Sequence, residues 1–164
     1  MNLTLAQKQT LKADILADGA LSSQPNTNAG NTVIAEAYNA LANPVFWAWR
    51  TAVSRADIYN LHSPDNTDWD WTIYKGQGVA EQNAWIQMFM ADIADFSKAN
   101  LRAGIGKIFG AANANTTHSL AVGRRQATRG ERLYATGTGT SVAPGLFVLE
   151  GAMTVLNIEE ARNS

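Results

Sequence analysis

The chain has 164 residues, of which 46% are hydrophobic and 16% charged, and 13 lysines and arginines nearly balance 14 aspartates and glutamates. This length suffices for one buried core, and the balanced charge excludes a global field that would attract nucleic acid or an anionic membrane. With no cysteine, thiol catalysis, thiolate metal sites and disulfides are excluded. The first residues mix lysines with apolar side chains, unlike a signal peptide, and no apolar run approaches the roughly 20 residues of a membrane span, so we expect a soluble protein.

Apolar residues at helical spacing predict the first two elements. Thr4 is a suitable N-cap for a helix over about residues 4–18, which should end near Gly19. A turn-rich segment follows, and a second apolar stripe predicts a helix over about residues 33–41.

The dipeptide Asn43-Pro44 predicts the start of a third helix. Asparagine can cap a helix, and proline fits its first turn because its missing N–H costs nothing there. This helix would carry the stretch VFWAWRTAV at 45–53, whose three aromatic rings cannot all face one core.

Three further helices are expected in the middle of the chain. Aromatic and aliphatic residues at helical intervals predict a long helix over about 79–96. Ser97 is a suitable N-cap for the next helix, which should end at Gly110. A last long helix is expected from Thr116 or Thr117 to Tyr134.

The C-terminal residues predict a change of structure. The run TGTGT includes Gly137 and Gly139 and is typical of a flexible hinge. The apolar stretch LFVLEGAMTVLN, at 146–157, is consistent with a short hairpin or an extended arm, and IEEAR with a closing helical turn.

These patterns together predict a mainly α fold. We expect a compact helical bundle of about five to six helices in residues 1–135, followed by a hinge and a C-terminal extended arm or short β-hairpin in residues 136–164, as a single domain overall.

Four arginines lie within nine residues, namely Arg124, Arg125, Arg129 and Arg132. On the predicted helix the last three would share one face, because they are spaced at i, i+4 and i+7. Guanidinium groups suit phosphate or carboxylate recognition, so three interpretations stay open. The face could contact DNA, form salt bridges between subunits, or be plainly solvated.

The remaining motifs do not predict chemistry. TGTGT lacks the spacing of a phosphate-binding loop, and Asp65, Asp68 and Asp70 lack the spacing of a calcium loop. His62 and His118 have no second histidine at metal-ligand spacing. We therefore predict no catalytic, cofactor-binding or metal-binding residues, no cofactor and no enzymatic activity.

Several stretches together resemble a family of small virion proteins encoded among the structural genes of tailed bacteriophages. They are LTLAQKQTLKADI, FWAWRTAV, ANLRAGIGKIFG, RRQATRGERLYATGTGT and LEGAMTVLNIEEAR. By analogy with phage proteins of this length and helical character, the resemblance implies a head-to-tail adaptor, which forms a ring of about twelve copies under the portal.

The resemblance also implies partners and a contact surface. The partners would be other copies of the chain, the portal protein and other tail or neck proteins, with non-specific contact to packaged DNA as a further option and no membrane. The location would be the virion, assembled in the host bacterial cytoplasm. The expected subunit or portal interface comprises the arginines and apolar residues of the arm: Arg124, Arg125, Arg129, Arg132, Phe147, Leu149, Val155 and Leu156.

An alternative placement is a tail or baseplate protein with a receptor-facing surface. It would use exposed tryptophans as anchors, with Trp47, Trp49, Trp69 and Trp71 as the candidates.

Overall fold

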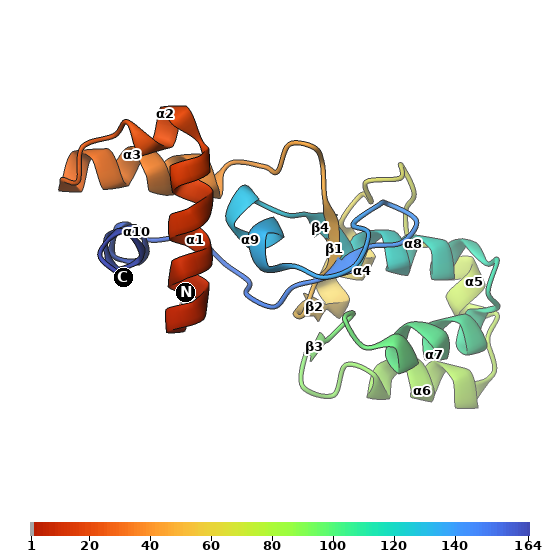
Figure 1. Ribbon diagram of the computed structural model, residues 1–164. Helices are drawn as coiled ribbons and strands as arrows, with labels where there is room; N and C mark the ends of the chain where they lie inside the picture. The colour runs from red at the N-terminus through yellow and green to blue at the C-terminus, as the bar shows by residue number, and fades with distance from the viewer. Residues whose placement is uncertain (1) are drawn as a thin grey trace. The chain divides into compact units, whose positions relative to one another are not determined.

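The computed structural model describes residues 2–164, about half of which are helical (Figure 1). The described residues form ten helices and five short strands, so the prediction of a mainly α fold is confirmed. The elements are shorter and more numerous than in the expected bundle of five to six helices. The elements are α1 (Leu5–Ala17), α2 (Gly19–Ser22), α3 (Asn28–Asn39), β1 (Trp47–Trp49), β2 (Val53–Ser54), α4 (Arg55–Asn60), α5 (Trp71–Lys75), α6 (Val79–Gln87), β3 (Ile93–Ala94), α7 (Ala99–Phe109), α8 (Ala114–Val122), β4 (Arg124–Gln126), α9 (Arg129–Tyr134), β5 (Gly145–Leu146) and α10 (Val155–Arg162).

The chain forms two compact units that do not follow the expected division at residue 135. The first unit contains residues up to 48 together with 126–164, and the second contains 49–125. Residues 136–164 therefore belong to the same unit as the N-terminal helices, because α10 packs against α1 and α3.

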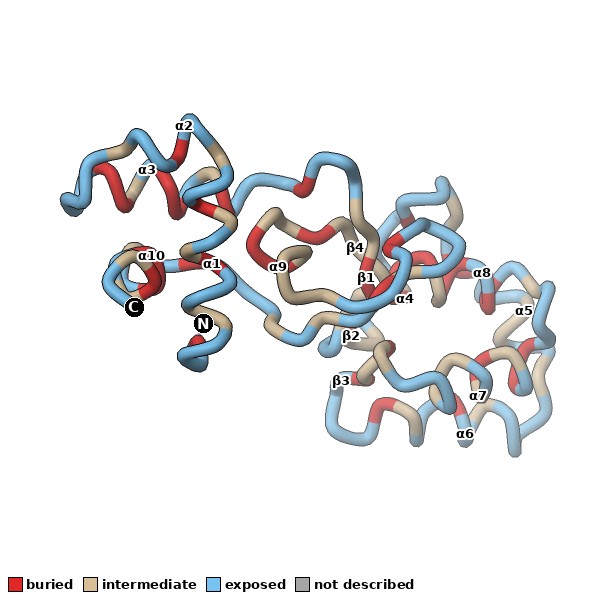
Figure 2. The backbone as a smooth tube through the Cα atoms, in the orientation of Figure 1, coloured by how far each residue is buried: buried red, intermediate tan, exposed pale blue. Residues whose placement is uncertain are grey.

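The first unit is built around α1, α3 and α10. Thr4 caps α1 in a capping box with Gln7, as its position predicted, and Thr27 caps α3. Figure 2 shows buried positions recurring along these helices, as expected for amphipathic helices around one core. The buried core residues are Leu3, Leu11, Ile15, Leu21, Ile34, Ala35, Tyr38, Met153, Ile158 and Ala161.

The second unit has its own core, which is rich in aromatic residues. Its buried members are Val53, Ile58, Trp69, Trp85, Phe89, Ala94, Phe96, Ile105, Ile108, Phe109 and Val122. The Trp69 ring stacks on Trp85 with centroids 5.1 Å apart, and both indoles contact the ring of Phe109. Strands β2 and β3 form an antiparallel pair in which Val53 lies opposite Ala94. The other sheet has the order β4-β1-β5.

The predicted helix over 45–53 is wrong, because this stretch contains β1 and β2. In β1 the side chain of Ala48 is buried while those of Trp47 and Trp49 are half-buried, an alternation with the period of two that strands have. The backbone hydrogen bonds are non-local: the Trp47 N–H donates to the carbonyl of Gly139 at 2.7 Å. Backbone groups of this stretch thus form their hydrogen bonds with residues distant in sequence, in place of the local bonds of a helix.

The predicted long helix over 79–96 is correct only in its first half. Helix α6 ends at Gln87, and Asp92 adopts a φ of 60°, a left-handed conformation that ends any helix. The chain then enters β3, which pairs with β2. The next helix, α7, ends at Gly110 with a φ of 94°, as predicted, but its N-cap is Lys98 and not the predicted Ser97.

The predicted helix up to Tyr134 is divided into α8, β4 and α9. Gly123 follows α8, and a Cβ at this position would lie 2.0 Å from the Phe96 ring, so only glycine fits there. Thr128 then starts α9 in a capping box with Glu131. The arginines consequently lie on two elements, and the expected arginine face of one helix does not exist.

Candidate functional site

The four arginines are divided between two elements that belong to different units. Two of them, Arg124 and Arg125, are half-buried on β4 and are the last residues of the second unit. The other two, Arg129 and Arg132, lie on α9 in the first unit. Arg124 pairs within the second unit with Asp65, its Nη2 lying 2.6 Å from Oδ1 and 2.5 Å from Oδ2. This guanidinium is therefore engaged inside the chain.

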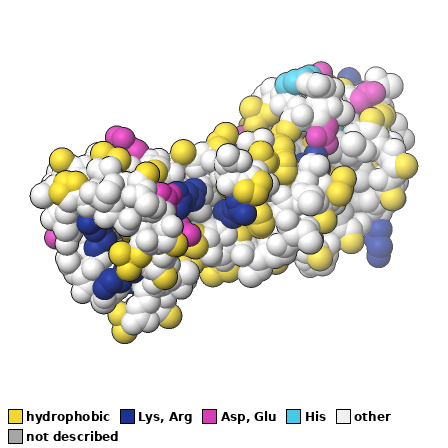
Figure 3. All heavy atoms as spheres, turned by 45° about the horizontal axis from the view of Figure 1, so that its top comes forward, with side chains coloured by type: hydrophobic (Ala, Val, Ile, Leu, Met, Phe, Trp, Pro, Cys, Tyr) yellow, Lys and Arg dark blue, Asp and Glu magenta, His cyan; other side chains and the backbone are white. Residues whose placement is uncertain are grey.

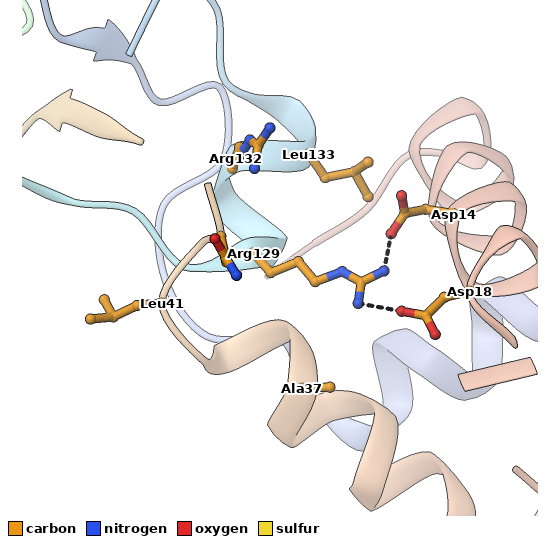
Figure 4. Close-up of a pocket in the computed structure, with 8 residues that line it drawn as sticks. Asp14, Asp18, Ala37, Leu41, Arg129, Arg132 and Leu133 are labelled. Carbon is orange, nitrogen blue, oxygen red and sulfur yellow. Dashed lines mark hydrogen bonds and ion pairs between the residues drawn. The ribbon is translucent and has the colours of Figure 1, made fainter. Parts of the chain in front are cut away.

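Arg129 extends from α9 toward the end of α1 and contacts two carboxylates there (Figure 4). Its Nη1 lies 2.7 Å from Oδ2 of Asp18, and its Nη2 lies 2.9 Å from Oδ2 of Asp14. Asp14 also accepts a hydrogen bond from the Tyr38 hydroxyl, and the Arg129 guanidinium lies over the Tyr38 ring at 4.7 Å. The Arg129 guanidinium thus contacts three side chains: Asp14 on α1, Tyr38 on α3, and Asp18, which directly follows α1.

The pKa values in this network shift as the contacts require. The hydrogen bond from Arg129 lowers the pKa of Asp18, and backbone N–H groups of α2 add to the effect. Burial lowers the pKa of Arg129, but the hydrogen bonds with Asp18 and Asp14 outweigh it and the pKa is raised. Burial and the hydrogen bond to Asp14 raise the pKa of Tyr38, and burial raises that of Tyr134 to about 12. All these groups keep their ordinary charge at neutral pH.

The network forms one wall of a cleft of about 620 Å³ within the first unit. Arg132 also lines the cleft and donates to the carbonyl of Pro44 at 3.0 Å. The cleft is lined by Asp14, Asp18, Ala37, Leu41, Asn43, Arg129, Arg132 and Leu133 (Figure 4).

The two carboxylates of the cleft have structural tasks. Asp18 caps α2 by accepting from the N–H groups of Ala20 and Leu21, and Asp14 accepts from Tyr38 and Arg129. Carboxylates committed in this way hold helices together, and the residues that line the cleft include no serine, threonine, lysine or histidine beside them. The cleft is therefore best described as a structural ion-pair network.

Glu131 connects α9 to the C-terminal segment. Its side chain is only 1% exposed, and its two oxygens accept from the N–H groups of Thr128 at 3.0 Å and Gly151 at 2.9 Å. A buried carboxylate that accepts hydrogen bonds fixes the backbone that supplies them. Residue 151 is thereby held against α9.

The apolar residues predicted for an interface differ in exposure. Leu149 and Val155 pack against the core of the first unit, and Phe147 is half-buried. Leu156 is 58% exposed, and three residues of the same C-terminal segment that we did not predict are also exposed: Val142 at 91%, Leu146 at 41% and Val148 at 55%. Hydropathy alone cannot separate these two groups, because both are equally apolar.

The predicted hinge is a closed loop in the structure. Gly137 and Gly139 have φ values of 95° and 68°, which favour glycine. Thr136 and Leu146 exchange both backbone hydrogen bonds at the base of the loop. Gly139 is buried against Phe46, where a Cβ would lie 2.1 Å from the ring. Movement about these glycines stays a prediction.

Polar residues outside the cleft also have structural partners. His62 lies 2.9 Å from Asp68, whose carboxylate raises the pKa of the imidazole, and Asp70 caps α5. Among residues 2–164 no group of three or more histidines, aspartates or glutamates could hold a metal ion. No helix in this part of the chain has the length and apolar character needed to cross a membrane.

Two features of the site had sequence signals that we missed. Thr128 and Glu131 have the spacing of a capping box, which marks the start of a helix between Arg125 and Arg129. Asp14 and Asp18 are four residues apart and therefore lie on one side of the predicted first helix. Their pairing with Arg129, more than a hundred residues away, had no signal.

Comparisons with protein-family models, with curated proteins and with solved structures gave no match for this chain.

Proposed function

We propose that the chain is a structural protein of a tailed bacteriophage virion, most specifically a head-to-tail adaptor subunit that forms a ring under the portal. The resemblance of its sequence to small phage virion proteins suggests the setting. The observation that carries the proposal is the exposure of apolar side chains along residues 136–164, above all Val142 and Leu156. Assembly would follow in the host bacterial cytoplasm.

An apolar side chain in water gains free energy when a neighbour covers it. Full burial of one valine or leucine contributes about 1.5 to 3 kcal/mol. Val142 is 91% exposed at the loop between Thr136 and Leu146, and Leu156 is 58% exposed on α10. Figure 3 shows hydrophobic side chains at the surface among mostly uncharged ones, which suits contact with other proteins better than contact with DNA.

The arginines have a smaller part in this proposal than their sequence suggested. Arg124 and Arg129 are engaged by aspartates of their own units, so charge reversal at either position would test folding as well as assembly. Paired guanidinium groups also give little support to contact with packaged DNA. The proposed surface to other copies, the portal and other neck proteins therefore consists of the exposed apolar residues Val142, Leu146, Val148 and Leu156.

A paired substitution tests this surface. Val142→Ser combined with Leu156→Ser should weaken co-sedimentation with the portal protein of the same genome at least about tenfold, which corresponds to about 1.4 kcal/mol. The matched control is Val79→Ser, since Val79 is 75% exposed but lies in the second unit. Wild-type portal binding by the double variant would refute the proposed surface.

A tail or baseplate protein with a receptor-facing surface is the second candidate. Of the four tryptophans considered, only Trp71 is well exposed, at 46%, and it contacts the rings of Tyr59 and Tyr74. Trp69 is buried, and Trp47 and Trp49 are half-buried. If Trp71→Ala abolished attachment of virions to cells while portal binding stayed intact, this second placement would be favoured.

A further inference from the structure

The sequence has one Asp-Gly dipeptide, at Asp18 and Gly19, and no Asn-Gly dipeptide. In such a pair the backbone nitrogen of the glycine can attack the aspartate Cγ, because glycine has no Cβ to hinder the approach. The N–Cγ bond forms, the carboxyl C–O bond breaks, and the departing hydroxyl takes the amide proton and leaves as water. Water then opens the five-membered imide. Opening at the α-carbonyl leaves an isoaspartate, in which the chain continues through Cβ.

The fold keeps the two reacting atoms apart. Asp18 ends α1 and caps α2, because its N–H donates to the Ile15 carbonyl at 3.2 Å and its own carbonyl accepts from the Ser22 N–H at 2.8 Å. Between these bonds ψ of Asp18 is 107°, which turns the Gly19 nitrogen away from Cβ about the Cα–C bond. Ring closure needs the nitrogen on the side of Cβ, so Asp18 must first leave the joint between the two helices.

The carboxylate of Asp18 is held as well. Its Oδ1 accepts from the N–H groups of Ala20 at 3.1 Å and Leu21 at 3.3 Å, and its Oδ2 lies 2.7 Å from Nη1 of Arg129. Arg129 opposes the reaction in a second way, since its hydrogen bond lowers the pKa of Asp18 and favours the ionised form. An ionised carboxylate resists attack, because an oxide ion is a far worse leaving group than a hydroxide.

We propose that Asp18-Gly19 is a latent site of isoaspartate formation and that the ion pair with Arg129 keeps it closed. The reaction proceeds when the joint between α1 and α2 opens locally and takes Asp18 away from its partners. Isomerisation then damages the first unit, because the inserted backbone carbon displaces the cap of α2. Leu21 follows the cap directly and is only 6% exposed, so its place in the core is lost with it.

Long incubation near body temperature and at neutral pH tests the site. Mass spectrometry with electron-transfer fragmentation locates isoaspartate, since it distinguishes the two isomers at one residue. We expect isoaspartate at residue 18 to form at least about tenfold more slowly in the folded chain than in the chain unfolded in guanidinium chloride. Equal rates would overturn the protection by the fold, and no isoaspartate in the unfolded chain would overturn the site itself.

Arg129→Met tests the ion pair. It should speed isomerisation of the folded chain about threefold or more, the moderate factor expected for a pair that water partly screens. Arg132→Met, on the same helix, should keep the wild-type rate. Ile158→Val controls for general loosening, because it removes one methyl group from the buried core of the same unit and should accelerate the reaction less. An Arg129→Met rate that exceeds neither the wild type nor Ile158→Val would overturn the role of Arg129.

Gly19→Ala tests the attacking atom. A Cβ at this position meets nothing within 4 Å, so the fold accommodates alanine, while the added methyl group hinders the backbone nitrogen. The rate should fall severalfold both in the unfolded chain and in the Arg129→Met background. A rate that Gly19→Ala leaves unchanged would show that the glycine nitrogen is not the attacking atom and would overturn the proposal.

Discussion

At the residue scale, Arg129 is the cation that holds two carboxylates and an aromatic ring together in the first unit. It pairs with Asp14 and Asp18 and lies over Tyr38, with its own side chain 32% exposed. Partial exposure moderates the strength of such pairs, because water screens them. The network nevertheless joins α9 to α1, although α1 ends at Ala17 and α9 begins only at Arg129.

Replacement of Arg129 by methionine should lower the free energy of unfolding by about 1 to 2 kcal/mol, because two carboxylates lose their cation. The matched control is Arg132→Met, on the same helix and the same cleft, because the Arg132 side chain donates a hydrogen bond to the Pro44 carbonyl and forms no ion pair with Asp14 or Asp18. That variant should stay within about 0.5 kcal/mol of the wild type. Urea unfolding measures both, and equal losses in the two variants would contradict the assigned role of Arg129.

Asp18 predicts how acid affects this network. Its pKa in the folded chain lies below the ordinary value of 3.8, mainly because Arg129 donates to it. A lowered folded pKa contributes stability that is complete above 3.8 and is lost as the pH falls through the folded pKa. The contribution should therefore disappear only in acid below about pH 4.

The variant Asp18→Asn isolates this contribution, because asparagine keeps the capping oxygen but not the charge. It should be less stable than the wild type at pH 7, and the difference should shrink at about pH 3. Urea midpoints at both values measure it. A difference that is the same at the two pH values would exclude a charge effect.

At the element scale, the loop from Thr136 to Leu146 is the clearest departure from expectation. The loop contains the two glycines predicted to form a hinge. It is closed at its base by the backbone hydrogen bonds that Thr136 and Leu146 exchange, and Gly139 packs on Phe46. Glycine is thus required here for a left-handed backbone and a close approach, and not only for freedom of movement.

Gly139→Ala should destabilise the chain by about 1 to 3 kcal/mol, because a Cβ would meet the Phe46 ring and the φ of 68° disfavours alanine. Gly19→Ala is the control, since a Cβ there meets nothing within 4 Å and the residue begins a helix. The control should be neutral or stabilising by up to about 1 kcal/mol. Thermal unfolding compares the two, and a tolerated Gly139→Ala would show that the loop is open in solution.

Elements whose signals are local could be predicted from the sequence. Thr4 at the start of α1 and Gly110 at the end of α7 act through hydrogen bonds and dihedral angles within a few residues. Elements that depend on distant partners could not. The stretch around Trp47 and Trp49 forms a strand because its backbone pairs with residues more than seventy positions away.

The candidate site shows the same limit. The arginines were conspicuous in the sequence, but their helix was wrong because Gly123 and the Thr128 capping box divide it. Arg124 pairs with Asp65 and Arg129 with Asp14, and folding alone brings these distant residues together. The exposed apolar residues could not be predicted either, since the sequence does not reveal that Leu149 packs against the core while Leu156 is exposed.

At the scale of the whole molecule, charge and surface composition agree with a role in assembly. Only 16% of residues are charged, several of the charges are paired inside the units, and uncharged and apolar groups dominate the face in Figure 3. A subunit of a ring has a head-to-tail interface, which closes only when the rotation between neighbours divides a full turn. In the adaptor proposal the portal supplies that rotation as a template, so we expect the isolated chain to be a monomer.

The mass of the purified protein, measured by light scattering alone and after mixing with the portal protein of the same genome, tests the proposed role most directly. The adaptor proposal predicts a monomer of 17.7 kDa that joins the portal in about twelve copies. A stable trimer or hexamer that ignores the portal would contradict it and would favour a position in the tail or baseplate.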